Sequence, residues 1–247
     1  SGGSIYKYAN IASMKSHGIE FTISSKNIQS KDFSWNTDFI FSKAKNEVTE
    51  LNARSSVMDL VSGYGFARQG YPVRGLFSIP FVGLSSNGIP MYNINGKITS
   101  TDIDFQTRDN IDYLKYEGPT DPTITGSFGN IFTYKAFKLN VFITYSFGNV
   151  VRLNPCFNYQ YSDLSSMPRE FKNRWTVPGD ERHTNIPAII SKRQYEDNKD
   201  LMYAYNAYNY STERIAKGDF IRMKEISLSY DFPKSWITSA KIGRASC

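Results

Sequence analysis

Hydrophobic and polar residues alternate with a period of two near the start of the chain. Between Gly18 and Ile28 the apolar positions are Ile19, Phe21 and Ile23. After a short turn at 29–32 the alternation continues from Phe33 to Asn46, with apolar positions at Phe33, Trp35, Phe39 and Phe41. Because successive side chains point to opposite faces of a strand, this pattern predicts a hairpin with one apolar and one polar face.

The same alternation returns about a hundred residues later. Thr123–Tyr134 and Phe137–Gly148 form a second predicted hairpin around a tight turn at Lys135 and Ala136. A last strand, Asp219–Phe232, has Ile226, Leu228, Tyr230 and Phe232 on one face and ends before Pro233. These strands exceed the roughly 5–6 residues common in soluble proteins and reach the roughly 9–11 that a membrane barrel needs.

Three further features favour a membrane barrel over a soluble sandwich. The polar face is rich in Ser, Thr and Asn, as a wet interior requires, and aromatic residues gather near the strand ends, as in interfacial girdles. The connections are also asymmetric, since the turns after Ile28 and Tyr134 are short while the loops at about 47–122 and 149–217 are long. We therefore expect an all-β fold: a partial transmembrane antiparallel β-barrel, an open curved sheet in this chain, with long extracellular loops.

Composition narrows the class of protein. Aromatic residues make up 15% of the 247 residues, with 17 Phe, 17 Tyr and 3 Trp, which excludes a helix bundle in favour of strands and turns. The net charge is +6, but the basic residues are scattered, so we predict no nucleic-acid partner. The two cysteines, Cys156 and Cys247, and the two histidines have no metal-ligand spacing, so we expect no metal and no cofactor.

The ends of the sequence indicate a piece of a longer protein. The chain begins Ser-Gly-Gly-Ser without an initiator Met, and no signal peptide is visible. Residues 241–247 break the preceding pattern and read like a translated sequencing adapter. We therefore take 1–240 as an internal barrel fragment and 241–247 as a non-native tail.

A series of short motifs resembles one family along nearly the whole chain. The motifs, in order, are His17-Gly18-Ile19-Glu20-Phe21, Gln69-Gly70-Tyr71-Pro72, Phe81-Val82-Gly83-Leu84, Asn87-Gly88-Ile89-Pro90-Met91-Tyr92, Gly118-Pro119-Thr120-Asp121-Pro122, Arg174-Trp175-Thr176-Val177-Pro178-Gly179-Asp180 and the final strand from Asp219 to Tyr230. In this order they are similar to the C-terminal barrel region of SusC/RagA-type TonB-linked transporters of Bacteroidetes-like bacteria.

The resemblance implies a function and partners. Such proteins import glycans or peptides across the outer membrane of Gram-negative bacteria through a large, plugged barrel. They are powered by the TonB–ExbBD complex and are capped by a SusD-like surface lipoprotein. The resemblance thus implies contact with outer-membrane lipid, and it implies transport rather than catalysis. We expect no enzymatic activity, and we interpret Glu20 and Asp38 on the polar face as lumen-lining charge rather than as a catalytic pair.

The long loops are where we expect binding residues. Tyr203, Tyr205, Tyr208 and Tyr210, with Asn206 and Asn209 between them, offer flat apolar rings with polar tips. They are candidates for contact with the substrate or with the lipoprotein lid, and the alternative is packing within the loop. Trp175 is a further candidate, although the following Pro178-Gly179 favours a structural anchor in a tight turn.

Two alternative functions remain from the sequence. One is a carbohydrate-binding β-sandwich, which would have to bury Phe21, Phe39, Phe128, Val141 and Leu228 in a closed core. The other is a siderophore receptor of the wider TonB-dependent group, which growth on iron chelates rather than glycans would reveal.

Overall fold

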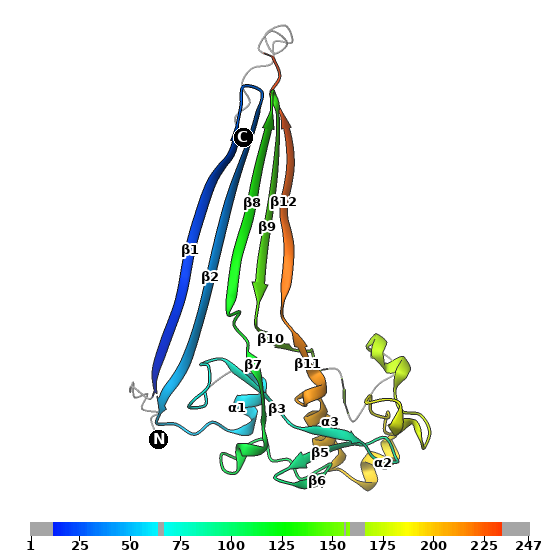
Figure 1. The fold of residues 1–247 in the computed structure, drawn as a ribbon. Coiled ribbons are helices and arrows are strands. Elements are labelled where there is room, and N and C mark those ends of the chain that lie inside the picture. Colours follow the sequence, from blue (N-terminus) through cyan, green and yellow to red (C-terminus); the bar gives the residue numbers. More distant parts are fainter. Residues whose placement is uncertain (1–11, 64–66, 156, 159–165, 234–247) are drawn as a thin grey trace, which may run out of the picture. The chain divides into compact units, whose positions relative to one another are not determined.

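The computed structural model describes residues 12–63, 67–155, 157–158 and 166–233 (Figure 1). The chain divides into two compact units. The first unit comprises Ser1–His17, Lys45–Asp121 and Gly148–Gly218, and the second comprises Gly18–Ala44, Pro122–Phe147 and Asp219–Cys247. The predicted adapter tail, 241–247, lies outside the described residues.

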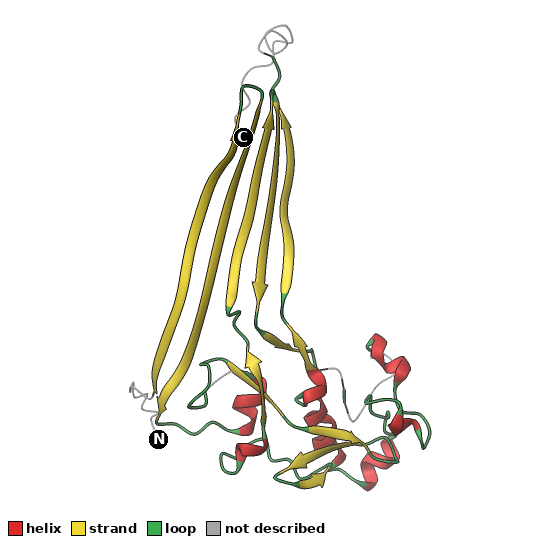
Figure 2. Ribbon diagram, in the orientation of Figure 1, coloured by secondary structure: helices red, strands yellow, loops and turns green. Residues whose placement is uncertain are grey.

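Five long strands form one open sheet in the order β1-β2-β8-β9-β12 (Figures 1 and 2). Their bounds are β1 Ala12–Gln29, β2 Phe33–Leu51, β8 Ile124–Tyr134, β9 Phe137–Phe147 and β12 Phe220–Tyr230. The pairs β2–β8, β8–β9 and β9–β12 are antiparallel. The five predicted strands and the open antiparallel sheet are therefore confirmed, and β1 and β2 are longer than the alternation indicated.

The register brings the apolar positions of neighbouring strands onto one face. Phe39 pairs with Phe128, Phe128 with Ile143, and Ile143 with Met223. A bulge between Met223 and Glu225 inserts one residue into β12. The bulge shifts the alternation by one position, so Met223 and Ile226 share this face while Glu225 points to the other. We refer to the surface around these residues as the apolar face.

Large side chains on the apolar face are uncovered. Leu228 is 70% exposed, Ile226 68% and Ile19 68%. Of the five side chains that a sandwich would bury, Phe21, Phe128 and Leu228 are exposed, and Phe39 and Val141 are only half-buried. The β-sandwich alternative is therefore wrong for this sheet.

The first unit contains the segments predicted as long loops, and it has secondary structure of its own (Figure 2). Its strands are β3 Gly75–Ser78, β4 Phe81–Leu84, β5 Pro90–Ile94, β6 Lys97–Thr99, β7 Lys115–Pro119, β10 Val150–Arg152 and β11 Ile215–Lys217. Its α-helices are α1 Val57–Ser62, α2 Lys192–Asp197 and α3 Leu201–Asn209, and short 3-10 helices lie at Ile111–Tyr113, Arg169–Asn173, Asp180–Arg182 and Thr212–Arg214. None of the helices in the described residues combines the length and apolar character needed to span a bilayer.

The hydrophobic core that the described residues form lies in this first unit. It is a single cluster of buried apolar side chains that includes Leu60, Phe77, Ile79, Tyr92, Ile103, Phe105, Leu114, Phe171, Ala204 and Tyr205. Capping boxes fix the starts of two helices, Ser56 with Asp59 on α1 and Ser191 with Gln194 on α2. The first unit is thus held by a closed core, whereas the apolar side chains of the second unit face outward.

Candidate functional site

The tyrosines of the predicted cluster lie on or directly after helix α3, and they differ in burial. The alternation of apolar residues did not predict this helix. Ala204 and Ala207 are fully buried, and their small side chains let the helix approach the core closely. Tyr205 and Tyr208 lie on the same buried side, whereas Tyr203 is 41% exposed. Asn206, three residues after Tyr203, is half-buried, so these two side chains are the more accessible ones on this part of the helix.

Two of the four tyrosines are part of the core. The hydroxyl of Tyr205 donates to the carbonyl of Ala188 at 2.5 Å, and that of Tyr208 donates to the carbonyl of Asn185 at 2.8 Å. The ring of Tyr208 also packs edge-on against Phe81 and Phe157. For Tyr205 and Tyr208 these contacts favour the packing alternative over contact with a substrate or lid.

Tyr210 has an intermediate environment at the end of α3. Its half-buried ring lies 5.8 Å from the ring of Phe105, centroid to centroid, and the guanidinium of Arg152 lies 5.6 Å from its centroid. Arg152 itself donates to the carbonyls of Val61, Phe77 and Ser211. Burial lowers the pKa of Arg152 to about 10, so the side chain stays charged at neutral pH. Tyr210 and Arg152 therefore join segments of the core.

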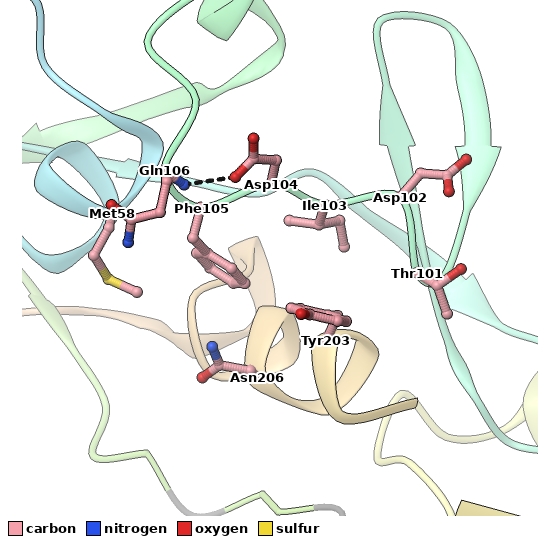
Figure 3. A pocket seen from close by; sticks show the side chains of 9 residues that line it. All are labelled: Met58, Thr101, Asp102, Ile103, Asp104, Phe105, Gln106, Tyr203 and Asn206. Carbon is pink, nitrogen blue, oxygen red and sulfur yellow. Dashed lines mark hydrogen bonds between the residues drawn. The ribbon is translucent and has the colours of Figure 1, made fainter. Parts of the chain in front are cut away.

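Tyr203 borders a hollow of about 580 Å³ (Figure 3). We call this the Tyr203 hollow. Its lining comes from three segments: α1, the segment 101–106 and α3. The residues are Met58, Thr101, Asp102, Ile103, Asp104, Phe105, Gln106, Tyr203 and Asn206. Ile103 and Phe105 are buried and form the apolar floor, while Asp104, Gln106 and Tyr203 are exposed at the rim.

The polar groups of the Tyr203 hollow are largely available to a ligand. The Oδ1 of Asp104 accepts the backbone N–H of Gln106 at 2.8 Å. Within the described residues, the side-chain amides of Gln106 and Asn206 make no hydrogen bond, and Asp104 forms no ion pair. On the side of Tyr203 the hollow offers an accessible aromatic ring and the carboxamide of Asn206, whereas the carboxylate of Asp104 points away from Tyr203 on the other side of the segment 101–106 (Figure 3).

Charge is distributed unevenly around the hollow. Asp102 is paired with Lys97, whose Nζ lies 2.5 Å from Oδ2, and the hydrogen bond and charge of Lys97 lower the pKa of this carboxyl. Burial raises the pKa of Tyr113 to about 12, and the negative charge of Asp104 adds to this rise. The negative charge of Asp104 thus acts on Tyr113, whereas the charge of Asp102 is compensated by Lys97.

Trp175 lies elsewhere, in a tight turn of the first unit. Its indole N–H donates to Oε2 of Glu181 at 3.0 Å, and its backbone N–H donates to the carbonyl of Ile186 at 2.9 Å. A Cβ on Gly88 would lie 2.5 Å from the Trp175 ring, so the indole packs directly against the Gly88 backbone. These contacts favour the structural-anchor interpretation of Trp175.

The structure thus separates the predicted site residues. Of the five candidates, Tyr203, Tyr205, Tyr208, Tyr210 and Trp175, only Tyr203 is exposed and borders the hollow. Contact of these residues with a substrate or with the lipoprotein lid stays a prediction. Sequence reasoning missed Asp104 and Gln106, although Thr101–Gln106 alternates polar and apolar positions, a pattern that could have shown them facing away from Ile103 and Phe105. Within the described residues, no group of three or more His, Cys, Asp or Glu side chains is placed to hold a metal ion.

Comparison with known proteins relates the chain to one group of receptors. TonB-dependent receptor P3 of Formosa agariphila is 25% identical over 258 residues, which cover 92% of this chain and 23% of the receptor. TonB-dependent receptor SusC of Bacteroides thetaiotaomicron is 26% identical over 242 residues, which cover 95% of this chain and 22% of SusC. No protein-family model matches the chain.

Solved structures share the fold. The structure of the RagAB peptide transporter aligns with a TM-score of 0.67 and 20% sequence identity over 96% of this chain and 24% of the transporter chain. The RagAB peptide importer in the 'open-open' state gives a TM-score of 0.61 over 94% of this chain. The resemblance to SusC/RagA-type transporters is therefore confirmed in both sequence and fold, and the chain spans less than a quarter of the length of the proteins it matches.

Proposed function

We propose that this chain forms part of the barrel wall and external loops of a TonB-dependent importer in the outer membrane of a Gram-negative bacterium. The observation that carries this proposal is the uncovered apolar face of the five-stranded sheet. Leu228, Ile226 and Ile19 are each at least two-thirds exposed on strands long enough to cross a bilayer. Large contiguous apolar surface is rare on soluble monomers and is stable when lipid covers it.

The similarity to TonB-dependent receptors supports the direction of transport and the energy source. In this proposal the short turns after β1 and β8 lie on the periplasmic side, and the segments that form the first unit lie outside the cell. Energy comes from the TonB–ExbBD complex through parts of the protein that this chain does not span. The role is transport and not catalysis.

The proposed partner is a SusD-like surface lipoprotein, and the proposed cargo is an oligosaccharide or a peptide. The lipoprotein is supported by the similarity to SusC and RagAB. The saccharide is supported by the exposed ring of Tyr203, and the peptide by the RagAB peptide transporter. An iron-chelate cargo is the alternative, and uptake assays with radiolabelled ferric chelate, oligosaccharide and peptide would separate the three.

The barrel-wall proposal is tested by placing a charge on each face of one strand. We expect Ile226→Lys in the full-length protein to reduce the folded amount in outer-membrane fractions sharply, because Ile226 lies near the middle of β12 and a lysine in the lipid-facing band costs about 2–4 kcal/mol near the bilayer centre. Ser227→Lys is the matched control, since it adds the same charge one residue away on the opposite face. Equal amounts of both variants would contradict the proposal.

A second test addresses energy coupling. We expect cells that lack TonB to bind the cargo at the surface and not to accumulate it, while wild-type cells accumulate it. Accumulation without TonB would contradict the import mechanism and would leave the membrane location of the sheet intact.

A further inference from the structure

The apolar face of β1 and β2 ends in basic residues on the side away from the turn at 29–32. On β2 every second residue from 33 to 41 lies on this face and is uncharged, and the next two positions are Lys43 and Lys45. On β1 the face is apolar at 19–23 and reaches Lys15 four residues farther out. Because side-chain direction alternates along a strand, these lysines continue the apolar face.

The pairing of β1 with β2 places these basic side chains next to one another. Gly18 lies directly opposite Ala44, since a Cβ on Gly18 would be 3.3 Å from the Cβ of Ala44. The two pairs that flank this contact point to the other face, with about 5 Å between the Cβ atoms of each pair. They are His17 with Lys45 and Ile19 with Lys43. The rings of Phe21 and Phe41, two positions farther along, stack 5.1 Å apart on that same face.

The three lysines have free ammonium groups. Lys15, Lys43 and Lys45 are all exposed, and within the described residues none of them forms an ion pair. Glu47 is the nearest carboxylate along β2, so positive charge remains in excess. We call Lys15, Lys43 and Lys45 the lysine patch. It offers three charged donor groups at the border of an apolar surface.

The lysine patch has about the height of a lipid headgroup layer. From the level of Lys43 to that of Lys15 the two strands advance by four positions, which is about 13 Å along the strands. A barrel strand tilted by about 45° turns this length into a height of about 9 Å. The polar layer on each side of the hydrocarbon core is about 5–8 Å thick. Lysine stems can lie along apolar neighbours such as Ile19 while their ammonium groups reach into that layer.

We propose that the lysine patch binds the phosphate groups of a phosphorylated lipid in the outer leaflet of the membrane, with the acyl chains of that lipid on the apolar face. The inference rests on the proposed barrel-wall function and goes beyond it, because it assigns a specific lipid contact to three residues. Charge complementarity supports the phosphate, since ammonium groups donate short, charge-assisted hydrogen bonds to phosphate oxygens. Continuity with the apolar face supports a lipid as the source of that phosphate.

The test compares two lipids that differ only in phosphate. The probes are lipid A that carries one phosphate and the same lipid A after enzymatic removal of the phosphate. Native mass spectrometry of the detergent-purified full-length protein, titrated with each probe, measures the two affinities. A lysine near an anionic lipid surface contributes about fivefold in affinity. We expect the phosphorylated lipid to bind at least about tenfold more tightly at low salt, and this preference to decrease as ionic strength rises.

Variants assign the preference to the lysine patch. Changing all three of its lysines to glutamine should bring the two lipids to within about twofold of each other, because the stems remain and the charges are lost. Changing all three to arginine should retain the preference, since the positive charge remains. The control variant changes three exposed lysines outside the patch to glutamine and should bind like the wild type. These are Lys138, Lys172 and Lys192.

Several results would overturn the inference. Equal binding of the two lipids to the wild type, an unchanged preference in the glutamine variant, or the same loss in the control variant would each do so. Displacement of the lipid by an equal concentration of inorganic phosphate would show that the patch binds free phosphate instead. Failure of the proposed function would appear separately, in the membrane-fraction assay of Ile226→Lys and in the TonB-dependent uptake assay, neither of which changes the lysine patch.

Discussion

The indole N–H of Trp35 donates to Oδ1 of Asn130 at 2.9 Å, between two strands whose residues are 95 positions apart in the sequence. The hydroxyl of Thr37 donates to the same oxygen at 2.8 Å, and Asn130 is only 7% exposed. These polar side chains belong to the apolar face, because Trp35 and Thr37 pair with Phe132 and Asn130 in the register. Asn130 of β8 therefore links the two strands by accepting hydrogen bonds from two side chains of β2, and we call this arrangement the Asn130 staple.

We expect Asn130→Ala to destabilise the full-length protein by about 1–3 kcal/mol, because it leaves the Trp35 N–H without its acceptor in an apolar setting. Asn36→Ala is the matched control: it removes a hydrogen bond with Gln29 that is exposed, and its effect should stay within about 0.5 kcal/mol. Urea unfolding of the two variants and the wild type measures the difference. Equal stability of the two variants would show that the staple contributes nothing.

Gly88 provides a prediction for the first unit. Its φ of +73° is strained for any side chain, and a Cβ would also collide with Trp175 and Ala188. Gly96 has a φ of +86° but no atom within 4 Å of the Cβ position. We therefore expect Gly96→Ala to cost about 1 kcal/mol from backbone strain alone, and Gly88→Ala to cost clearly more. Limited proteolysis of the external segments in the intact protein would rank the two variants, and a reversed ranking would contradict the packing of Trp175 on Gly88.

The turn that holds Trp175 should depend on pH only under acid conditions. Hydrogen bonds from the backbone and side chain of Thr176 and from the backbone of Val177 lower the pKa of Asp180 below 3.8. Hydrogen bonds also lower the pKa of Glu181 below 4.5, first from its own backbone N–H and then from the Trp175 indole and the backbone of Gly179. A carboxyl with a lowered folded pKa contributes stability that is complete above its unfolded pKa and is lost as pH falls through the folded value.

We therefore expect the environment of Trp175 to be constant between pH 8 and about pH 5 and to change below about pH 4. The measurement is the tryptophan fluorescence of the full-length protein minus that of Trp175→Phe. Glu181→Gln should weaken this acid transition, because the amide does not titrate. A transition near pH 6 would contradict the assignment to these carboxyls.

The alternation of the chain was sufficient to predict the five long strands and their faces. A period of two is a local signal, and one apolar face follows from it directly. The exposure of that face does not follow from the alternation, because a sandwich that buries the face would show the same pattern. The bulge after Met223 was not predictable in this way, because it depends on how β12 pairs with β9. Likewise, in the sequence Asn130 is only a polar residue that interrupts an apolar pattern. Its role becomes visible when the pairing of β2 with β8 brings it within hydrogen-bond distance of Trp35.

The candidate site was less predictable. The tyrosines were recognised as a cluster, but their roles depend on which side of α3 meets the core. Tyr205 and Tyr208 donate to carbonyls of 185–188, and Tyr203 faces away from this contact. Asp104 and Gln106 reach the same hollow from a segment about a hundred residues earlier, so no local pattern links them to Tyr203.

The sequence by itself determined that long two-faced strands would form a sheet with one apolar side, because side-chain direction in a strand alternates whatever lies around it. Only the tertiary structure decided that the intervening segments pack into a unit with its own core, and that one exposed tyrosine borders a hollow. The physical reason is that burial and electrostatic compensation are properties of neighbours in space, and in this first unit those neighbours come from distant parts of the chain.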